Sequence, residues 1–291
     1  MKHKSVLLNE TIFAISPRSG GVYLDMTLGA GGHTRKLLEL SSPDGVVIAF
    51  DKDKAAIKNA QKTLKEEYGE RLVLIHDDFA NCTEHLEKLG YESVDGVVMD
   101  LGVSLDQLTS KERGFSFMVD GPLDMRMDKS KPLTAQRIVN TWDENELANL
   151  LKLYGEERFA SRIARNIVRH RPITTTRQLA EIVEKSVPRN FYRRIHPATR
   201  TFQALRIVVN DELESLQKGL KNAIELLKKS GVICVISFHS LEDRIVKNIF
   251  RDMKNRGVLR LLNRKPIRPS REEIEANRRA RSAKLRCAVK N

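Results

Sequence analysis

Apolar residues in the first hundred positions form short runs that are separated by segments with helical spacing. The short runs are rich in Val, Ile and Leu and end at glycine or aspartate, as buried strands do. These runs predict strands at 22–28, 46–50, 71–76 and 94–99. The intervening segments predict helices at 33–40, 54–68 and 83–89. Strands that alternate with helices favour right-handed βαβ units and a parallel sheet.

The alternation stops at about residue 106 and resumes at about residue 211. Between these points we expect a loop at 109–132 and helices at 135–140, 143–154, 156–169, 176–186 and 199–209. The last part of the chain predicts a helix at 212–229, a strand at 232–238, a helix at 241–255 and two strands at 258–262 and 285–289.

The economical fold class is α/β, a Rossmann-like sheet with an inserted all-helical domain. Residues 1–105 and 211–291 would form the sheet domain, and residues 106–210 would form the insert. Two contiguous domains are the alternative. The insert is favoured because the strand–helix rhythm resumes near residue 211 and the first four strands need to be covered.

The sequence contains no predicted signal peptide, membrane span or zinc site. Residues Met1–Glu10 contain no apolar run of signal-peptide length, and the longest apolar stretch, Val232–Phe238, is too short to span a bilayer. We therefore expect a cytoplasmic protein without a membrane segment. Cys82, Cys234 and Cys287 form neither a C-x-x-C pair nor a zinc spacing, so we expect reduced thiols and no metal site.

The net charge of +13 and the pI of about 9.7 favour a polyanionic partner, either nucleic acid or an anionic membrane surface. A generally basic, solvated surface is the plainer alternative. Arginine and lysine are concentrated at 158–171 and at 264–286, and this uneven placement favours a specific partner.

A glycine-rich turn joins the first predicted strand to the first helix, where Asp25–Thr34 has the sequence DMTLGAGGHT. Glycines allow the backbone to approach a ligand closely, and open α/β sheets bind ligands at the carboxyl ends of their strands. Thr34 stands where a dinucleotide motif has its third glycine, which argues against an NAD-dependent oxidoreductase. No G-x-x-x-x-G-K-[ST] stretch exists, so a P-loop is excluded.

An acid ends each of the first four predicted strands, at Asp25, Asp51, Asp77–Asp78 and Asp100. Asp51 could accept both hydroxyls of a ribose, and an acid beside Phe79 could meet an adenine amine. S-adenosylmethionine, a nucleoside with cationic groups and no phosphate, fits this set. Each acid alone, like His33, is as readily a helix cap, but four acids in register favour the cofactor.

Three further stretches carry specific side chains without helix or strand periodicity: Arg113–Phe117 with Pro122–Asp128, His196–Ala204, and Ser237–Arg244. The last stretch lies where the fifth strand meets its helix, at the same end of the sheet as the glycines. It could therefore receive a methyl acceptor. His239 is a candidate base or a helix cap, and Phe238 is a candidate for base stacking or for core packing.

With these motifs the sequence resembles the ribosomal RNA small-subunit methyltransferase H family (RsmH, formerly MraW). The matching stretches are 25–34, 100–104, 113–117, 122–128, 154–165, 196–207, 237–247 and 279–286. The resemblance implies a class I methyltransferase fold with an inserted helical domain for substrate recognition. It also implies S-adenosylmethionine-dependent methylation of the N4 amine of cytidine 1402 in the 16S rRNA of the small ribosomal subunit.

The resemblance also implies cofactor-binding residues, which fall on Gly31, Gly32, His33, Asp51, Phe79, Asp100 and Gln107. The family usually has Ser-Pro before this glutamine, whereas this chain has Leu105 and Asp106, so we expect a looser turn. A DNA amino-methyltransferase and a non-catalytic RNA-binding protein are the alternatives. The first differs only in substrate, and the second leaves the four acids unexplained.

The implied reaction is difficult because the lone pair of a cytosine amine is delocalised into the ring. Acceptors for the amine protons would help. By position at strand four, Asp100 and the backbone carbonyls of Leu101 and Gly102 are the candidates, and His239 is a weaker one.

The target base must leave any helix to reach such a pocket, and Phe238 or Phe115 could stack on it. The arginines of the insert and of the tail, residues 264–286, are expected to hold phosphates.

Overall fold

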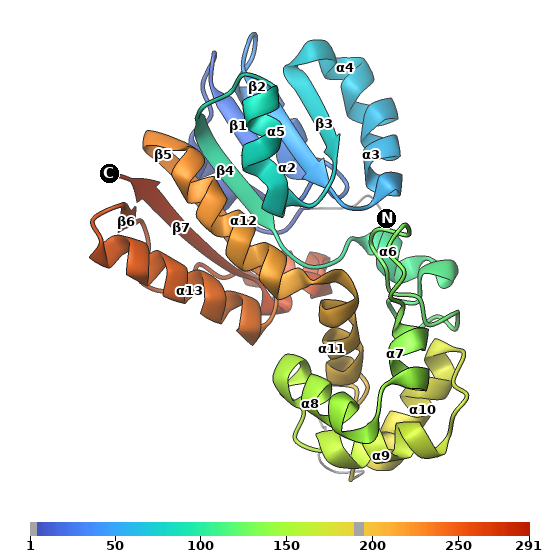
Figure 1. The fold of residues 1–291 in the computed structure, drawn as a ribbon. Coiled ribbons are helices and arrows are strands. Elements are labelled where there is room, and N and C mark those ends of the chain that lie inside the picture. Colours follow the sequence, from blue (N-terminus) through green and yellow to red (C-terminus); the bar gives the residue numbers. More distant parts are fainter. Residues whose placement is uncertain (1–4, 189–194) are drawn as a thin grey trace. The chain divides into compact units, whose positions relative to one another are not determined.

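The computed structural model describes residues 5–188 and 195–291. Part of the N-terminal stretch (1–4) and part of the predicted insert (189–194) lie outside the described residues. The chain forms two compact units, one of Met1–Gly102 with Leu213–Asn291 and the other of Val103–Glu212 (Figure 1). We call them the sheet unit and the helical unit.

The sheet unit is built on seven strands in the order β3-β2-β1-β4-β5-β7-β6. The strands are β1 (Val22–Asp25), β2 (Val46–Asp51), β3 (Leu72–His76), β4 (Val94–Asp100), β5 (Leu227–Ser237), β6 (Leu259–Leu261) and β7 (Lys284–Lys290). Strands β1 to β5 pair in parallel, and β7 is antiparallel to both β5 and β6. The prediction of a class I methyltransferase sheet with a helical insert is thus confirmed.

Helices cover both faces of this sheet because its central strands are apolar on both sides. Along β2, Ile48 and Phe50 pack on one face with α5, α12 and α13, while Val47 and Ala49 pack on the other face with α1 and α2. The helices of this unit are α1 (Leu8–Ile15), α2 (Gly32–Leu40), α3 (Lys54–Ala60), α4 (Glu66–Tyr68), α5 (Cys82–Lys88), α12 (Glu212–Leu226, from its second residue), α13 (Ser240–Asn255) and α14 (Arg271–Ala276).

The helical unit packs α7 to α11 around its own apolar core. Its helices are α6 (Leu105–Thr109), α7 (Ala135–Thr141), α8 (Glu144–Gly155), α9 (Ala160–Arg169), α10 (Thr176–Ser186) and α11 (Thr199–Asn210). Capping boxes begin α8 at Asp143 and α10 at Thr175, which explains why these helices start where the sequence predicts. Within the described residues, this unit has no strand ladder and one isolated bridge, Pro122 with Thr175.

Several predicted boundaries differ from the structure, among them the start of the fifth strand, which is at Leu227 rather than at residue 232. Three of the differences have a clear local cause. The first strand ends at Asp25 rather than at residue 28, because the Asp25 carboxylate accepts the N–H of Thr27 and turns the chain. The helix predicted to reach residue 229 ends at Leu226, since Leu227 already pairs with Val94 in the sheet. Helix α9 begins at Ala160 rather than at residue 156, where Glu156 has a left-handed backbone.

Three short helices, α1, α6 and α14, were not predicted. Each has eight residues or fewer, so its apolar periodicity is too brief to stand out in the sequence.

Candidate active site

The glycine turn after β1 is built around the buried carboxyl group of Asp25. One oxygen accepts the N–H of Thr27 (3.0 Å), and the other accepts the hydroxyl of Thr34 in α2 (2.6 Å). Burial raises the pKa of Asp25 to about 6. Gly31 has a left-handed φ of 79°, and a Cβ there would lie 2.4 Å from Leu64 Cδ1, so only glycine fits. Asp25 is therefore a structural support of the turn.

Two other residues of this turn have distinct neighbours. A Cβ on Gly32 would lie 2.0 Å from Ser5 Oγ, so this glycine packs directly against the N-terminal segment. His33 is buried in the first turn of α2, and its Nδ1 lies 3.7 Å from Asp100 Oδ2. The structure thus brings His33 to the end of β4.

Asp51 stands at the end of β2 and holds the backbone on either side. Its carboxylate oxygens accept the N–H of Gly29 (2.9 Å) and the N–H of Asp53 (2.8 Å). Burial raises the pKa of Asp51 to about 6. Each carboxylate oxygen has a further lone pair, so the group can still accept hydrogen bonds from two hydroxyls.

The acids after β3 are bonded to neighbouring side chains. The contacts are those of Asp78 with Lys52 Nζ (2.8 Å) and Ser215 Oγ (2.6 Å), and that of Asp77 with His85 Nε2 (2.8 Å). Phe79 packs against α12, because a Cβ on Gly219 would lie 2.5 Å from its ring. The side chain of Phe79 remains partly exposed.

Asp100, at the end of β4, is the least satisfied of these acids. Its N–H donates to Thr27 Oγ1 (2.6 Å), but its buried Oδ1 has no hydrogen-bond partner within the described part of the chain. Burial, reinforced by the charge of Asp25, raises the pKa of Asp100 to about 8. A buried acceptor without a partner is costly, and such groups mark sites that bind a cation or an N–H donor.

The turn after β5 lies beside the end of β4, since the N–H of Leu101 donates to the carbonyl of Ile236 (3.0 Å). Gly102 has a φ of 101°, and a Cβ there would lie 3.5 Å from Phe238 Cδ2. The partly exposed Phe238 ring therefore borders the backbone that follows Asp100.

His239 caps α13. Its Nδ1 accepts the N–H of Glu242 (3.4 Å), and its Nε2 lies 3.1 Å from Glu242 Oε1. The bond to Nδ1 requires the neutral ring to carry its proton on Nε2, a buried atom without a hydrogen-bond partner in the described residues, so the ring has no free lone pair. Glu242 was not among the residues expected in the site, although its place three residues after a capping residue is a recognisable capping-box signal.

Gln107 belongs to the helical unit and is buried in α6. Its Oε1 accepts the N–H of Ser104 (3.0 Å), and Ser104 Oγ accepts the N–H of Gln107 (3.2 Å). This capping box holds the turn that the loss of proline was expected to loosen.

A sequence model described as the MraW methylase family matches residues 1–291. The chain belongs to the MraW methylase family. Ribosomal RNA small subunit methyltransferase H of Geotalea daltonii is 47% identical over 308 residues, covering 99% of this chain and 98% of that protein. Its counterpart in Carboxydothermus hydrogenoformans is 48% identical over 306 residues, covering 99% and 97%.

A Streptococcus mutans protein solved in complex with SAH is among the solved structures that match this chain. It is 11% identical with a TM-score of 0.48, and the match covers 99% of each chain. The family resemblance predicted from the motifs is confirmed by the family match and the two curated relatives.

In this member of the MraW methylase family, the loop motif of the helical unit is closed on itself. Arg113 Nη2 donates to the carbonyls of Arg126 (3.0 Å) and Met127 (3.3 Å), and Arg126 donates to both oxygens of Asp124 (2.7 and 2.9 Å). Although burial opposes it, the bonds from Arg126 lower the pKa of Asp124. Phe115 is buried in the core of the unit, so it offers no free face to a base.

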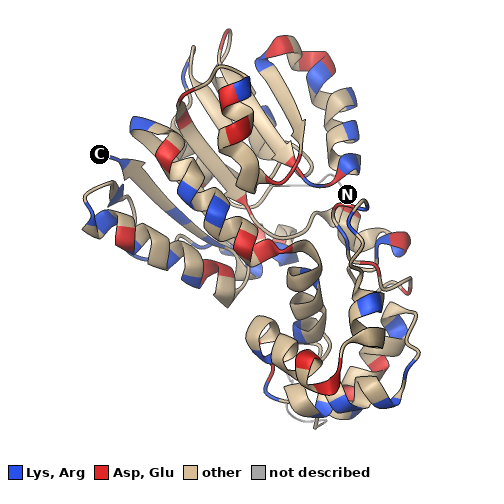
Figure 2. Ribbon diagram, viewed as in Figure 1, with Lys and Arg blue, Asp and Glu red and all other residues tan. Residues whose placement is uncertain are grey.

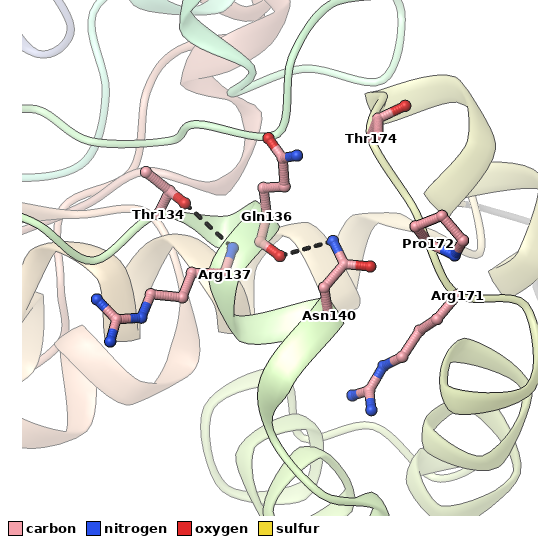
Figure 3. Close-up of a pocket in the computed structure, with 7 residues that line it drawn as sticks. All are labelled: Thr134, Gln136, Arg137, Asn140, Arg171, Pro172 and Thr174. Carbon is pink, nitrogen blue, oxygen red and sulfur yellow. Dashed lines mark hydrogen bonds between the residues drawn. The ribbon is translucent and has the colours of Figure 1, made fainter.

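A hollow lies between α7 and the segment that precedes α10 (Figure 3). It is lined by Thr134, Gln136, Arg137, Asn140, Arg171, Pro172 and Thr174. Asn140 braces it by exchanging two hydrogen bonds with the backbone of Ile173 (2.7 and 2.8 Å). Arg171 donates to the carbonyls of Val139 and Trp142 at the end of α7. No carboxylate lines this hollow.

Positive charge on the surface is arranged unevenly (Figure 2). Arg162, Arg165 and Arg169 are exposed on α9 at spacings that place them on one face. In the tail, Lys284 and Arg286 instead pair with Asp243 (2.9 and 2.7 Å). Among the described residues, no helix has the length and apolar character to span a membrane.

Proposed function

We propose that this chain methylates the N4 amine of cytidine 1402 in 16S rRNA of the small ribosomal subunit, with S-adenosylmethionine as donor. The observation that carries the proposal is the open carboxylate of Asp100, in a chain that belongs to the MraW methylase family throughout its length. The curated relatives are named ribosomal RNA small subunit methyltransferase H.

The residues at the strand ends fit the cofactor. When bound, S-adenosylmethionine supplies an electrophilic methyl group on a sulfonium. Asp51 has lone pairs for the ribose hydroxyls, and the unpartnered oxygen of Asp100 suits a cationic group. Gly31, Gly32 and His33 would hold the cofactor through the glycine turn. Phe79 and Gln107 complete the set by family resemblance.

The acceptor amine would lie at the end of β4. Asp100 Oδ1 would accept one amine proton as the nitrogen lone pair turns toward the methyl group, and the carbonyls of Leu101 and Gly102 would accept the other. An ionised carboxylate is needed for this step, and a bound cation lowers the pKa of a neighbouring carboxyl group. His239 is the weaker base because both of its nitrogens contact Glu242.

The helical unit would recognise the RNA. The exposed arginines of α9 and the acid-free hollow beside α7 offer donors for phosphates and base edges. We propose a cytoplasmic location, since the ribosomal subunit is found there and no described helix could span a membrane.

The test is incubation with tritiated S-adenosylmethionine and small subunits that lack the modification, followed by nuclease mapping and mass spectrometry. Label on N4 of one cytidine is the expected result. Label on DNA alone would favour a DNA amino-methyltransferase, and cofactor binding without transfer to any nucleic acid would favour a non-catalytic RNA-binding protein.

A further inference from the structure

Glu242 is a buried carboxylate that the proposed mechanism does not use. The residue lies in the first turn of α13 and is 2% exposed. One oxygen, Oε2, accepts the N–H of Phe238 (2.7 Å) and the N–H of His239 (3.2 Å). An ordinary capping-box glutamate binds only the N–H of the capping residue, here His239. The shorter bond goes instead to the residue before it, so Glu242 holds more than the start of the helix.

The additional bond fixes the residue that borders the acceptor side of the site. Phe238 is the first residue after β5, and its ring lies against Gly102, two residues beyond Asp100. The ring also packs against the apolar core of the sheet unit, and the bond to Glu242 adds a restraint on the backbone. With its N–H held by a buried carboxylate, the direction of the ring is set before any ligand arrives.

We propose that Glu242 is a positioning residue for the methyl acceptor, which fixes the Phe238–His239 turn so that the Phe238 ring forms the wall on which the target cytosine lies. The inference rests on the proposed function. A stacked base gains about 1–3 kcal/mol from an aromatic wall, and that gain depends on a ring held in a suitable orientation.

The location of a carboxylate here has a physical reason. Burying a negative charge is costly, but this one lies at the amino end of a helix of 16 residues and accepts two N–H bonds. A glutamine could accept the same two bonds through its amide oxygen, whereas alanine could accept neither. The two substitutions therefore separate the hydrogen bonds from the charge.

The experiment measures kcat and KM for small ribosomal subunits, and Kd for S-adenosylmethionine by calorimetry. Glu242→Ala is expected to raise the KM for RNA about tenfold, the scale of one stacking contact, and to leave the cofactor Kd within about twofold. Glu242→Gln should restore most of kcat/KM. Phe238→Leu should raise the KM for RNA as much as Glu242→Ala does. The KM of the double variant should be no higher than that of the more impaired single variant.

A matched control is Glu146→Ala, which removes the capping-box glutamate of α8 (2.8 Å from its oxygen to the N–H of Asp143). It should lower the melting temperature without changing the KM for RNA. If Glu242→Ala behaves like this control, or if its effect adds in full to that of Phe238→Leu, the inference is wrong.

If Glu242→Ala does not fold, Glu242→Asp replaces it, since a shorter carboxylate keeps the charge but cannot reach both N–H groups. A raised KM for RNA would then support the inference, and an unchanged KM would overturn it. The wild-type protein is assayed first. Failure of wild type to methylate small subunits contradicts the proposed function before any variant is compared.

Discussion

Two carboxylates, Asp124 in the helical unit and Asp100 in the sheet unit, are bonded in opposite ways. In the helical unit, both oxygens of Asp124 accept hydrogen bonds from Arg126, and these bonds lower the pKa of Asp124 against the effect of burial. In the sheet unit, Asp100 has an oxygen without a partner in the described residues, and burial raises its pKa to about 8.

The difference separates a scaffold from a site. Both regions stand out as motifs in the sequence. The loop around Asp124 uses its charges internally, which stabilises the loop and leaves little for a ligand. Asp100 instead remains an open acceptor at a cost in folding energy, which is the usual signature of a functional group.

Asp100→Asn should have the largest effect. Turnover is expected to fall about 100- to 1,000-fold, because an amide cannot accept the amine proton as a carboxylate does. Cofactor affinity should fall much less. Single-turnover assays and calorimetry would measure both quantities, and full turnover with unchanged affinity would contradict the role of Asp100.

The second largest effect should be the pH dependence of kcat/KM, which is expected to follow the ionisation of Asp100. As pH rises through about 8, Asp100 becomes ionised in the ligand-free protein, so kcat/KM should rise about tenfold per pH unit below 8 and level off above it. Its effect on stability has the opposite sign. Because the folded pKa exceeds the ordinary value near 4, the contribution of Asp100 to the free energy of unfolding declines as pH rises from about 4 to 8.

Urea unfolding of wild type and Asp100→Asn across this range provides the measurement. The difference between the two proteins should grow with pH up to about 8. A constant difference would show that burial at Asp100 does not control its ionisation.

Asp124→Asn should act on stability alone. Loss of a partly buried, doubly bonded ion pair is expected to lower the free energy of unfolding by about 1–3 kcal/mol. The affinity for S-adenosylmethionine should not change. Asp106→Asn, at an exposed acid of the same unit, is the control and should change stability by less than about 0.5 kcal/mol. Loss of cofactor binding in Asp124→Asn without loss of stability would show that Asp124 belongs to the binding site and is not a structural residue.

Arg165→Ala should have the smallest effect. The side chain is exposed and pairs with Glu144 (3.2 Å), a contact expected to contribute at most about 1 kcal/mol. RNA affinity should fall a few-fold, and the salt dependence of binding should decrease by about one phosphate contact. Arg256→Ala, at an exposed arginine that directly follows α13 and pairs with Asp252, is the control. An unchanged salt slope would remove Arg165 from the interface.

The sequence was sufficient to predict the parts of the fold that depend on burial. The runs ending at Asp51 and Asp100 are apolar on both faces, so the central strands and the acids at their ends stand out. It could not distinguish Asp100 from Asp124, because whether an acid is bonded depends on side-chain geometry that the pattern does not give, even when the partner, here Arg126, is two residues away. The capping role of His239 likewise depends on how Glu242 folds back onto the turn.

The antiparallel strand between β5 and β6 was also beyond the sequence pattern. Residues 285–289 predict a strand but not its neighbour, and its direction follows from contacts made at long range. The early end of α12 has a similar cause, since Leu227 leaves the helix to pair with Val94. In both cases tertiary pairing overrides local preference.

The pairing of β4 with β5 also sets the order in which the parts of this protein can fold during translation. Val97 lies beside Ile233, so the sheet cannot close until residues far beyond the helical unit have left the ribosome. The helical unit is continuous in sequence and can assemble earlier. During translation the edge of β4 that later pairs with β5 therefore stays unpaired while the helical unit is made. Strand β7, the last in sequence, is the last to join the sheet.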